Sequence, residues 1–75
     1  MGRLPVVSGR EAIKARAKVG FVEIRQSGSH IIIQKKIPGS TNSIPVPNHS
    51  ELMPGTLRSI IRKSGLSVDE FTGLL

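Results

Sequence analysis

The sequence has no cysteine, no tryptophan and no tyrosine, and only two phenylalanines among its 75 residues. The absence of cysteine excludes disulfide bonds and thiolate metal sites. Because aromatic rings are scarce, an RNA-binding protein that stacks unpaired bases on such rings is disfavoured. No apolar run is long enough for a signal peptide or a membrane span. We therefore expect an intracellular, cytoplasmic protein that does not contact a membrane.

Acidic residues are also scarce. Five Asp and Glu stand against eleven Lys and Arg, which gives a formal net charge of +6. This excess favours a polyanion or an acidic protein as the partner, although a basic soluble domain without such a partner is compatible with the charge alone. A chain of this length is expected to form one domain, over residues 1–75. Folding of such a domain buries a little over about 60% of the surface that the unfolded chain exposes, so its core is small.

The first helix is predicted from a capping box, in which the side chain of Ser8 accepts from the Glu11 amide and that of Glu11 reaches back to the Ser8 amide. Apolar residues follow at helical spacing, and Gly20 ends the pattern. Arg16 falls inside the apolar arc. Its stem can pack there while its guanidinium reaches either solvent or a site, and we favour solvent.

Two further helices are predicted near the end of the chain. Pro54 suits the first turn of one helix, which carries an apolar stripe and ends at Gly65. Ser67 and Glu70 form a second capping box, which opens a short last helix.

Between the helices, the sequence predicts a β-hairpin. Residues 21–26 and 29–36 carry β-branched side chains, and Ser27 and Gly28 supply a flexible turn between them. A turn-rich connection over residues 38–42 then leads to a third extended segment at 44–46, whose proline cannot donate to a ladder and restricts the segment to a sheet edge.

Alternation along the second strand divides its side chains between two faces. Ile31, Ile33 and Lys35 share the face that we assign to the core, whereas His30, Ile32 and Gln34 share the other. The predicted fold class is thus α+β, with a three-stranded antiparallel sheet, helices on one face and a free polar face toward which His30 points.

Several short motifs, taken together in their order and spacing, resemble the HicA (YcfA-like) messenger-RNA interferase toxins of toxin-antitoxin pairs. They are Leu4-Pro5-Val6, Ser8-Gly9-Arg10-Glu11, Gly20-Phe21, Arg25-Gln26, Gly28-Ser29-His30, Pro47-Asn48-His49, Pro54-Gly55-Thr56-Leu57-Arg58-Ser59-Ile60 and Gly65-Leu66. The resemblance covers nearly the whole chain. It implies a fold like the double-stranded-RNA-binding domain, with the order αβββα, which agrees with the elements expected from the residues.

The resemblance also implies an activity and a partner. Members of this family cleave messenger RNA with one histidine, which corresponds to His30, and a HicB-type antitoxin neutralises them. We therefore expect a complex with such an antitoxin, which would silence the toxin most simply by covering His30.

One histidine can contribute to RNA cleavage, because RNA supplies its own nucleophile in the 2′-hydroxyl. Imidazole, with an ordinary pKa of ~6.5, exchanges protons near neutral pH, and a positioned acid or base contributes ~10²–10⁴ in rate. Whether His30 acts as the base or the acid stays open. His49 is a possible accessory proton donor, or simply a surface residue. We expect no cofactor and no metal, because two histidines without a carboxylate at ligand spacing do not make a metal site.

The candidate RNA-binding residues are basic side chains or turn residues near His30 in the sequence or on the second long helix. They are Arg25, Gly28, Ser29, Lys35, Lys36, Arg58 and Arg62. Any single one of these charges also fits a solvated surface, and Gly28 serves the turn geometry in either case.

Two other functions compete with the nuclease. The charge and element order suit a noncatalytic module of the double-stranded-RNA-binding type, although such modules carry several lysines at the start of the last helix, where this chain has Met53, Pro54, Gly55 and Thr56. The small size and an apolar Ile32 on the open face suit a subunit that binds only an acidic protein.

Overall fold

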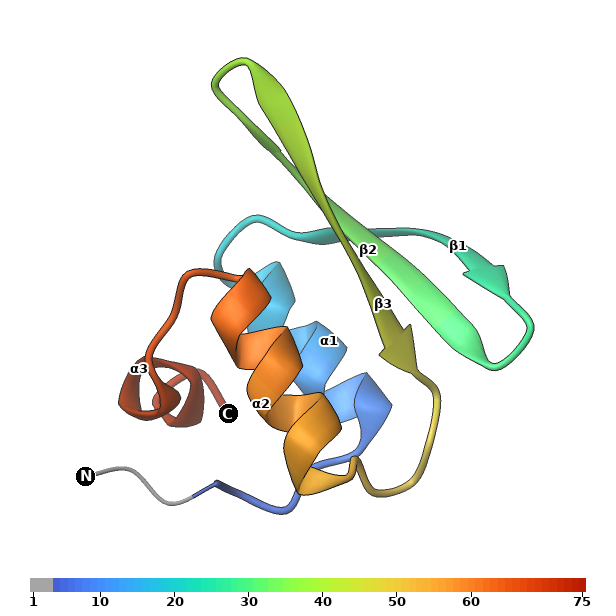
Figure 1. Ribbon diagram of the computed structural model, residues 1–75, viewed down its shortest axis with the longest axis vertical. Helices are drawn as coiled ribbons and strands as arrows, with labels where there is room; N and C mark the ends of the chain where they lie inside the picture. Colours follow the sequence, from blue (N-terminus) through green and yellow to red (C-terminus); the bar gives the residue numbers. More distant parts are fainter. Residues whose placement is uncertain (1–3) are drawn as a thin grey trace.

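The computed structural model describes residues 4–75, so residues 1–3 of the predicted domain lie outside the described part. The elements are α1 (Gly9–Ala17), β1 (Val22–Ser27), β2 (His30–Ile37), β3 (Ser40–Pro47), α2 (Pro54–Lys63) and α3 (Val68–Thr72). The strands form one antiparallel sheet in the order β1-β2-β3 (Figure 1). Helices α1 and α2 pack against the sheet, and α3 packs against α2. This confirms the predicted α+β fold, and β3 lies at a sheet edge as expected.

Within residues 4–75, no helix is both long and apolar enough to cross a membrane.

Both predicted capping boxes are present. At the start of α1, the Ser8 amide donates to Glu11 Oε1 at 2.8 Å, and the Glu11 amide donates to Ser8 Oγ at 3.0 Å. At the start of α3, Ser67 and Glu70 repeat the pattern with distances of 2.8 and 3.1 Å. These bonds satisfy amides that have no partner inside a helix, and so they fix where each helix begins.

The first hairpin turns one residue later than its sequence suggested. Ser27 pairs with His30, so the two turn residues are Gly28 and Ser29, and the strands shift accordingly. Gly28 has φ 60°, and a glycine at the first central position is the pattern of type II′ turns, whose twist matches that of the flanking strands. The turn therefore places His30 as the first residue of β2.

The second hairpin corrects the expected connection over residues 38–42. Ile37 pairs with Ser40, so only Pro38 and Gly39 form the turn. Proline followed by a glycine at φ 73° is the sequence pattern of a type II turn, which reverses the chain in two residues. Residues 40–42 are consequently free to pair, and β3 is longer than the predicted segment 44–46.

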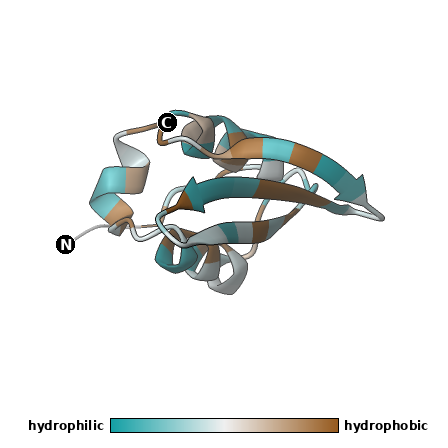
Figure 2. Ribbon diagram, turned by 90° about the horizontal axis from the view of Figure 1, so that it is seen from above, coloured by the Kyte–Doolittle hydropathy of each residue, from teal (hydrophilic) through white to brown (hydrophobic). Residues whose placement is uncertain are grey.

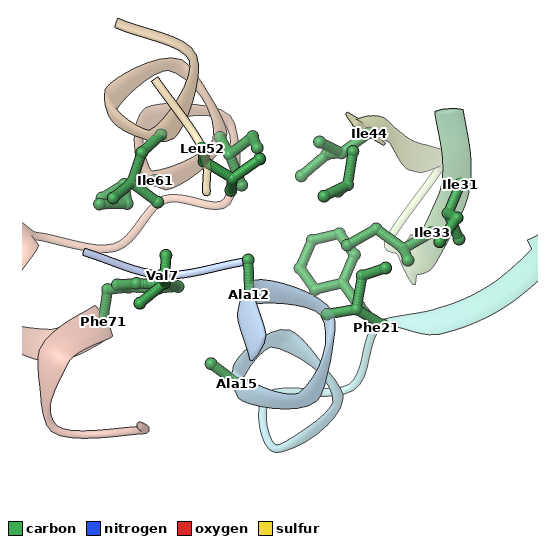
Figure 3. Packing of buried hydrophobic residues seen from close by; sticks show 14 residues of the cluster. Val7, Ala12, Ala15, Phe21, Ile31, Ile33, Ile44, Leu52, Ile61 and Phe71 are labelled. Atoms are coloured by element: carbon green, nitrogen blue, oxygen red, sulfur yellow. The ribbon is translucent and has the colours of Figure 1, made fainter. Parts of the chain in front are cut away.

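The hydrophobic core lies between the sheet and the helices, as predicted. Ile31 pairs with Val46, Ile33 pairs with Ile44, and all four side chains are at most 1% exposed. Phe21 packs with this sheet side of the core, and Ala12 of α1 separates it from the part formed by α2, α3 and the N-terminal segment (Figure 3). Apolar and polar residues alternate along the strands, so one sheet face is buried and the other is open (Figure 2).

The N-terminal end of α1 docks directly on the backbone after β3. The amide of Gly9 donates to the carbonyl of His49 at 2.9 Å, and the amide of Leu52 donates to the carbonyl of Val7 at 2.8 Å. A Cβ at Gly9 would collide with the carbonyl oxygen of Pro47 and lie 3.3 Å from the Cα of Asn48. Only glycine leaves room for this approach.

Arg16 does not reach solvent, and the expectation for it was wrong. Its side chain is 0% exposed, and its guanidinium lies 4.8 Å from the ring centroid of Phe71. None of its three guanidinium nitrogens has a hydrogen-bond partner within residues 4–75. The chain after α2 folds back over α1, and Phe71 of α3 closes the path to water. Burial lowers the pKa of Arg16 from its ordinary value to about 10.

We predict that Gly9→Ala lowers the free energy of unfolding by about 1–3 kcal/mol, the usual cost of forcing extra atoms into a packed site. Gly55→Ala is the matched control, because it also lies at the start of a helix and a Cβ there meets nothing within 4 Å. Urea denaturation of both variants checks the prediction. Equal stability of the two would contradict the close approach at Gly9.

We predict that Arg16→Met raises the free energy of unfolding by about 1–3 kcal/mol, because an unpaired buried charge is replaced by an apolar side chain of similar length. Below pH 10 the guanidinium of Arg16 is protonated in both the native and the unfolded state, so the stability difference between Arg16→Met and wild type is constant. Above about pH 10 the native wild type loses the proton first, and the difference between the two proteins narrows. Denaturation at several pH values measures this, with the exposed Lys14→Met as control. A less stable Arg16→Met would indicate that the guanidinium stabilises the fold.

Candidate active site

His30 is presented on the open face of the sheet. It pairs with Ser27 on one side and with Pro47 on the other, and its side chain is exposed. Because its neighbour Ile31 is buried on the helix face, alternation turns the imidazole outward. The amide of Asn48 donates to the carbonyl of Ser29 at 2.7 Å, so the backbone pairing continues past the histidine. The predicted orientation of His30 is confirmed.

The open face is not flat beside His30, because α2 rises next to the edge strand β3. A groove of about 380 Å³ runs between these two elements and includes the imidazole. The residues that line it are His30, Ile44, Pro45, Pro47, Gly55, Thr56, Ser59, Ile60 and Lys63. The groove therefore has an apolar wall from Pro45 and Pro47, with polar side chains contributed by His30 and by one row on α2.

The two walls of this groove, which we call the histidine groove, are tied together at the end that contains Lys63. Asn42 Nδ2 on β3 donates to the carbonyl of Lys63 at 2.8 Å, at the end of α2. Near the other end, the contact of Gly9 with Pro47 holds the end of β3 against α1. Ile44 and Ile60 lie at its base and belong to the core. The position of α2 relative to β3 is thus fixed by packing and by backbone contacts.

The polar side chains of the histidine groove are free to bind a ligand. Within residues 4–75, no intramolecular hydrogen bond uses the side chains of His30, Thr56, Ser59 or Lys63. The described residues contain one ion pair, between Arg10 and Glu23 at 2.9 Å, and no acidic residue lines the groove. An anion in the groove would therefore meet a lysine and no carboxylate.

The predicted residues of the first hairpin differ in their distance from His30. Arg25 is exposed and pairs with Ile32, so it shares the open face diagonally across from His30. Gly28 and Ser29 form the turn that precedes the histidine. Arg25 and this turn are the predicted residues that the structure brings closest to the imidazole.

The two adjacent lysines of β2 point to opposite faces. Lys36 shares the open face with His30 but lies six residues farther along the strand, about 20 Å away. Lys35 is on the helix face, where its Nζ lies 5.9 Å from the ring centroid of Phe21 and its stem covers Gly20. Lys35 is consequently separated from the imidazole by the sheet.

Arg58, Arg62 and His49 are exposed but do not line the histidine groove. On α2, the groove side is occupied by Ser59 and Lys63, and each arginine is rotated by about 100° from the residue that follows it. His49 lies in the loop after β3, where its carbonyl accepts from Gly9. None of these three residues therefore shares the histidine groove with His30.

The residues of α2 that line the histidine groove were not among the site residues predicted from the sequence. Thr56, Ser59 and Lys63 recur at a spacing of three and four residues, which places them in one row on the helix surface. That spacing is visible in the sequence, yet the sequence does not tell that this row faces β3 rather than solvent.

No group of three or more His, Cys, Asp or Glu side chains that could hold a metal ion occurs within residues 4–75.

A fold of three antiparallel strands with packed helices, and an exposed histidine after a Gly-Ser turn, define a small α+β protein with a polar groove beside that histidine. A family model described as the HicA toxin of bacterial toxin-antitoxin systems matches residues 9–66. The chain therefore belongs to the HicA toxin family, and as such it is the toxin of a pair with an antitoxin partner. A search of curated proteins finds no match to the chain. The family match ends before α3, the element that covers Arg16.

We predict that Gly28→Ala lowers the free energy of unfolding by about 1–2 kcal/mol, because a side chain at φ 60° is strained whatever the space around it. Ser29→Ala in the same turn has no such strain, and we expect a change of no more than about 0.5 kcal/mol. Thermal unfolding of the two variants compares them. Indistinguishable melting temperatures would show that the turn does not require its glycine.

Proposed function

We propose that this toxin is an endoribonuclease that cleaves messenger RNA without a metal ion, with His30 as its acid or base. The proposal is carried by one observation: the histidine of the Gly28-Ser29-His30 motif is exposed at a groove lined by a lysine and no carboxylate. Family membership supports the toxin role. We place the activity in the cytoplasm, where messenger RNA is found.

The chemistry needs one nucleophilic attack and two proton transfers at a phosphodiester. The ribose 2′-oxygen forms a bond to the adjacent phosphorus, and the bond from phosphorus to the 5′-oxygen breaks. The products are a 2′,3′-cyclic phosphate and a 5′-hydroxyl. The imidazole of His30 either takes the proton of the 2′-hydroxyl or gives one to the leaving oxygen, and water serves the other position. Such a group typically contributes about 10²–10⁴ in rate, so one histidine predicts a slow enzyme.

We further propose that the antitoxin is of the HicB type and silences the toxin by covering His30. The imidazole and the groove are exposed, so a bound protein excludes RNA by contact alone. A formal net charge of +6 favours an acidic surface on that partner. The resting form is then a hetero-oligomer of toxin and antitoxin.

The alternative is a noncatalytic module that binds double-stranded RNA, which the element order favours. Against it, the residues that begin α2 carry no positive charge until Arg58, and Arg58 does not line the groove. Backbone binding by the start of this helix would have little electrostatic support.

We predict that His30→Ala lowers the rate of RNA cleavage about 10²-fold or more and leaves the fold intact. Purified proteins are incubated with RNA in excess chelator, and products are followed on denaturing gels, with the cyclic phosphate identified by mass. His49→Ala is the matched control, because it removes the other histidine outside the groove. We expect it to cut within a few-fold of wild type.

Circular dichroism and melting temperature establish that both histidine variants are folded. Equal cleavage by wild type and His30→Ala would end the proposal for this residue. Tight duplex binding by wild type without any cleavage would favour the noncatalytic module.

A further inference from the structure

The histidine groove extends well beyond the imidazole. His30 pairs with Pro47 near the start of α2, whereas Lys63 is the last residue of that helix. The seven steps from Thr56 to Lys63 span about 10 Å at a rise of 1.5 Å per residue. His30 and Lys63 therefore occupy opposite ends, with Ser59 between them. The Lys63 backbone therefore lies about 10 Å along the groove from its His30 end, which suits its amine to the phosphate next to the one at the imidazole.

The shape and walls of the groove suit one unpaired nucleotide. Its volume of about 380 Å³ lies at the lower end of the range for small-molecule sites. Pro45 and Pro47 offer an apolar surface to the face of a base, and Ser59 and Thr56 offer hydroxyls to its edge or to the ribose. A base held in a duplex cannot enter, because it is stacked and paired.

The charge in the groove is well placed for the RNA backbone. Within residues 4–75, Lys63 forms no ion pair, so its charge is available to a ligand. Its carbonyl is held by Asn42 at 2.8 Å, which fixes the backbone from which the side chain extends. Arg58 and Arg62 lie on another side of the same helix.

We infer that the histidine groove is a subsite for one nucleotide of single-stranded RNA next to the scissile phosphate. In it, Lys63 binds the neighbouring phosphate, and Ser59 contacts the nucleotide between that phosphate and His30. The inference rests on the proposed nuclease function and adds to it the strandedness of the substrate. Because no Phe, Tyr or Trp lines the groove, the base between His30 and Lys63 is held by apolar contact and hydrogen bonds.

The test measures binding and cleavage separately. The binding probe is a short unstructured 2′-O-methyl RNA, which lacks the nucleophile, followed by fluorescence anisotropy at several salt concentrations. The cleavage substrate is the unmodified RNA of the same sequence. The proteins are wild type, Lys63→Gln, Ser59→Ala and the control Lys14→Gln, which removes an equal charge from an exposed position on α1, outside the groove.

We predict that Lys63→Gln weakens binding of the single strand about 3–10-fold at low salt and flattens the slope of log affinity against log salt by about 0.7, the value for one phosphate contact. KM for cleavage rises by a similar factor with kcat little changed. Ser59→Ala gives a smaller loss of about 2–5-fold, in the range of one neutral hydrogen bond. Lys14→Gln stays close to wild type in both assays.

Two results would overturn the subsite. One is an equal effect of Lys63→Gln and Lys14→Gln, which would make the lysine part of a diffuse charge. The other is an equal loss on the duplex of the same sequence, which would mean that Lys63 contacts any backbone. If wild type binds the analogue through Lys63 but never cuts the unmodified RNA, the subsite stands and the nuclease proposal fails.

Discussion

The alternation of side chains along β2 is the constraint on which the site depends. Ile31 and Ile33 are buried against Val46 and Ile44, and this burial forces His30 to the opposite face. A slip of one residue in either hairpin would turn the imidazole into the core and expose the isoleucines. In a core this small, other apolar contacts cannot replace the packing of these isoleucines. The register that buries them therefore also exposes His30.

The position of α2 turns an exposed histidine into a site. The helix is held at its base by Ile60 in the core and near its end by the bond from Asn42 to the carbonyl of Lys63. These contacts determine which side of the helix faces β3. The row of Ser59 and Lys63 then forms a wall with free polar groups, beside an edge strand whose prolines offer no amide of their own. The groove follows from how two ordinary elements pack, and no loop has to close over it.

Much of this could be predicted from sequence because it is encoded locally. Capping boxes begin α1 and α3 where the residues indicated, and the period of two along β2 assigned His30 to the open face. The turn positions were less accurate, because Gly28 with Ser29 and Pro38 with Gly39 each reverse the chain in two residues and the pairing of neighbouring strands decides where.

Features that need tertiary placement could not be predicted in this way. Arg16 lies in an apolar arc, yet its burial depends on α3 folding back so that Phe71 covers it. The groove side of α2 likewise depends on the angle at which the helix meets β3. For the same reason Lys63 was missed, while Arg58 and Arg62, equally basic in sequence, lie outside the groove.

The most direct measurement of whether RNA reaches the imidazole is an NMR titration of ¹⁵N-labelled protein with the 2′-O-methyl RNA. If His30 and the histidine groove form the site, the amide shifts of His30, Thr56, Ser59 and Lys63 change together, with saturation at one affinity. Shifts confined to the hairpin end around Lys36, or to the face of α2 that carries Arg58 and Arg62, with His30 unmoved, would contradict it.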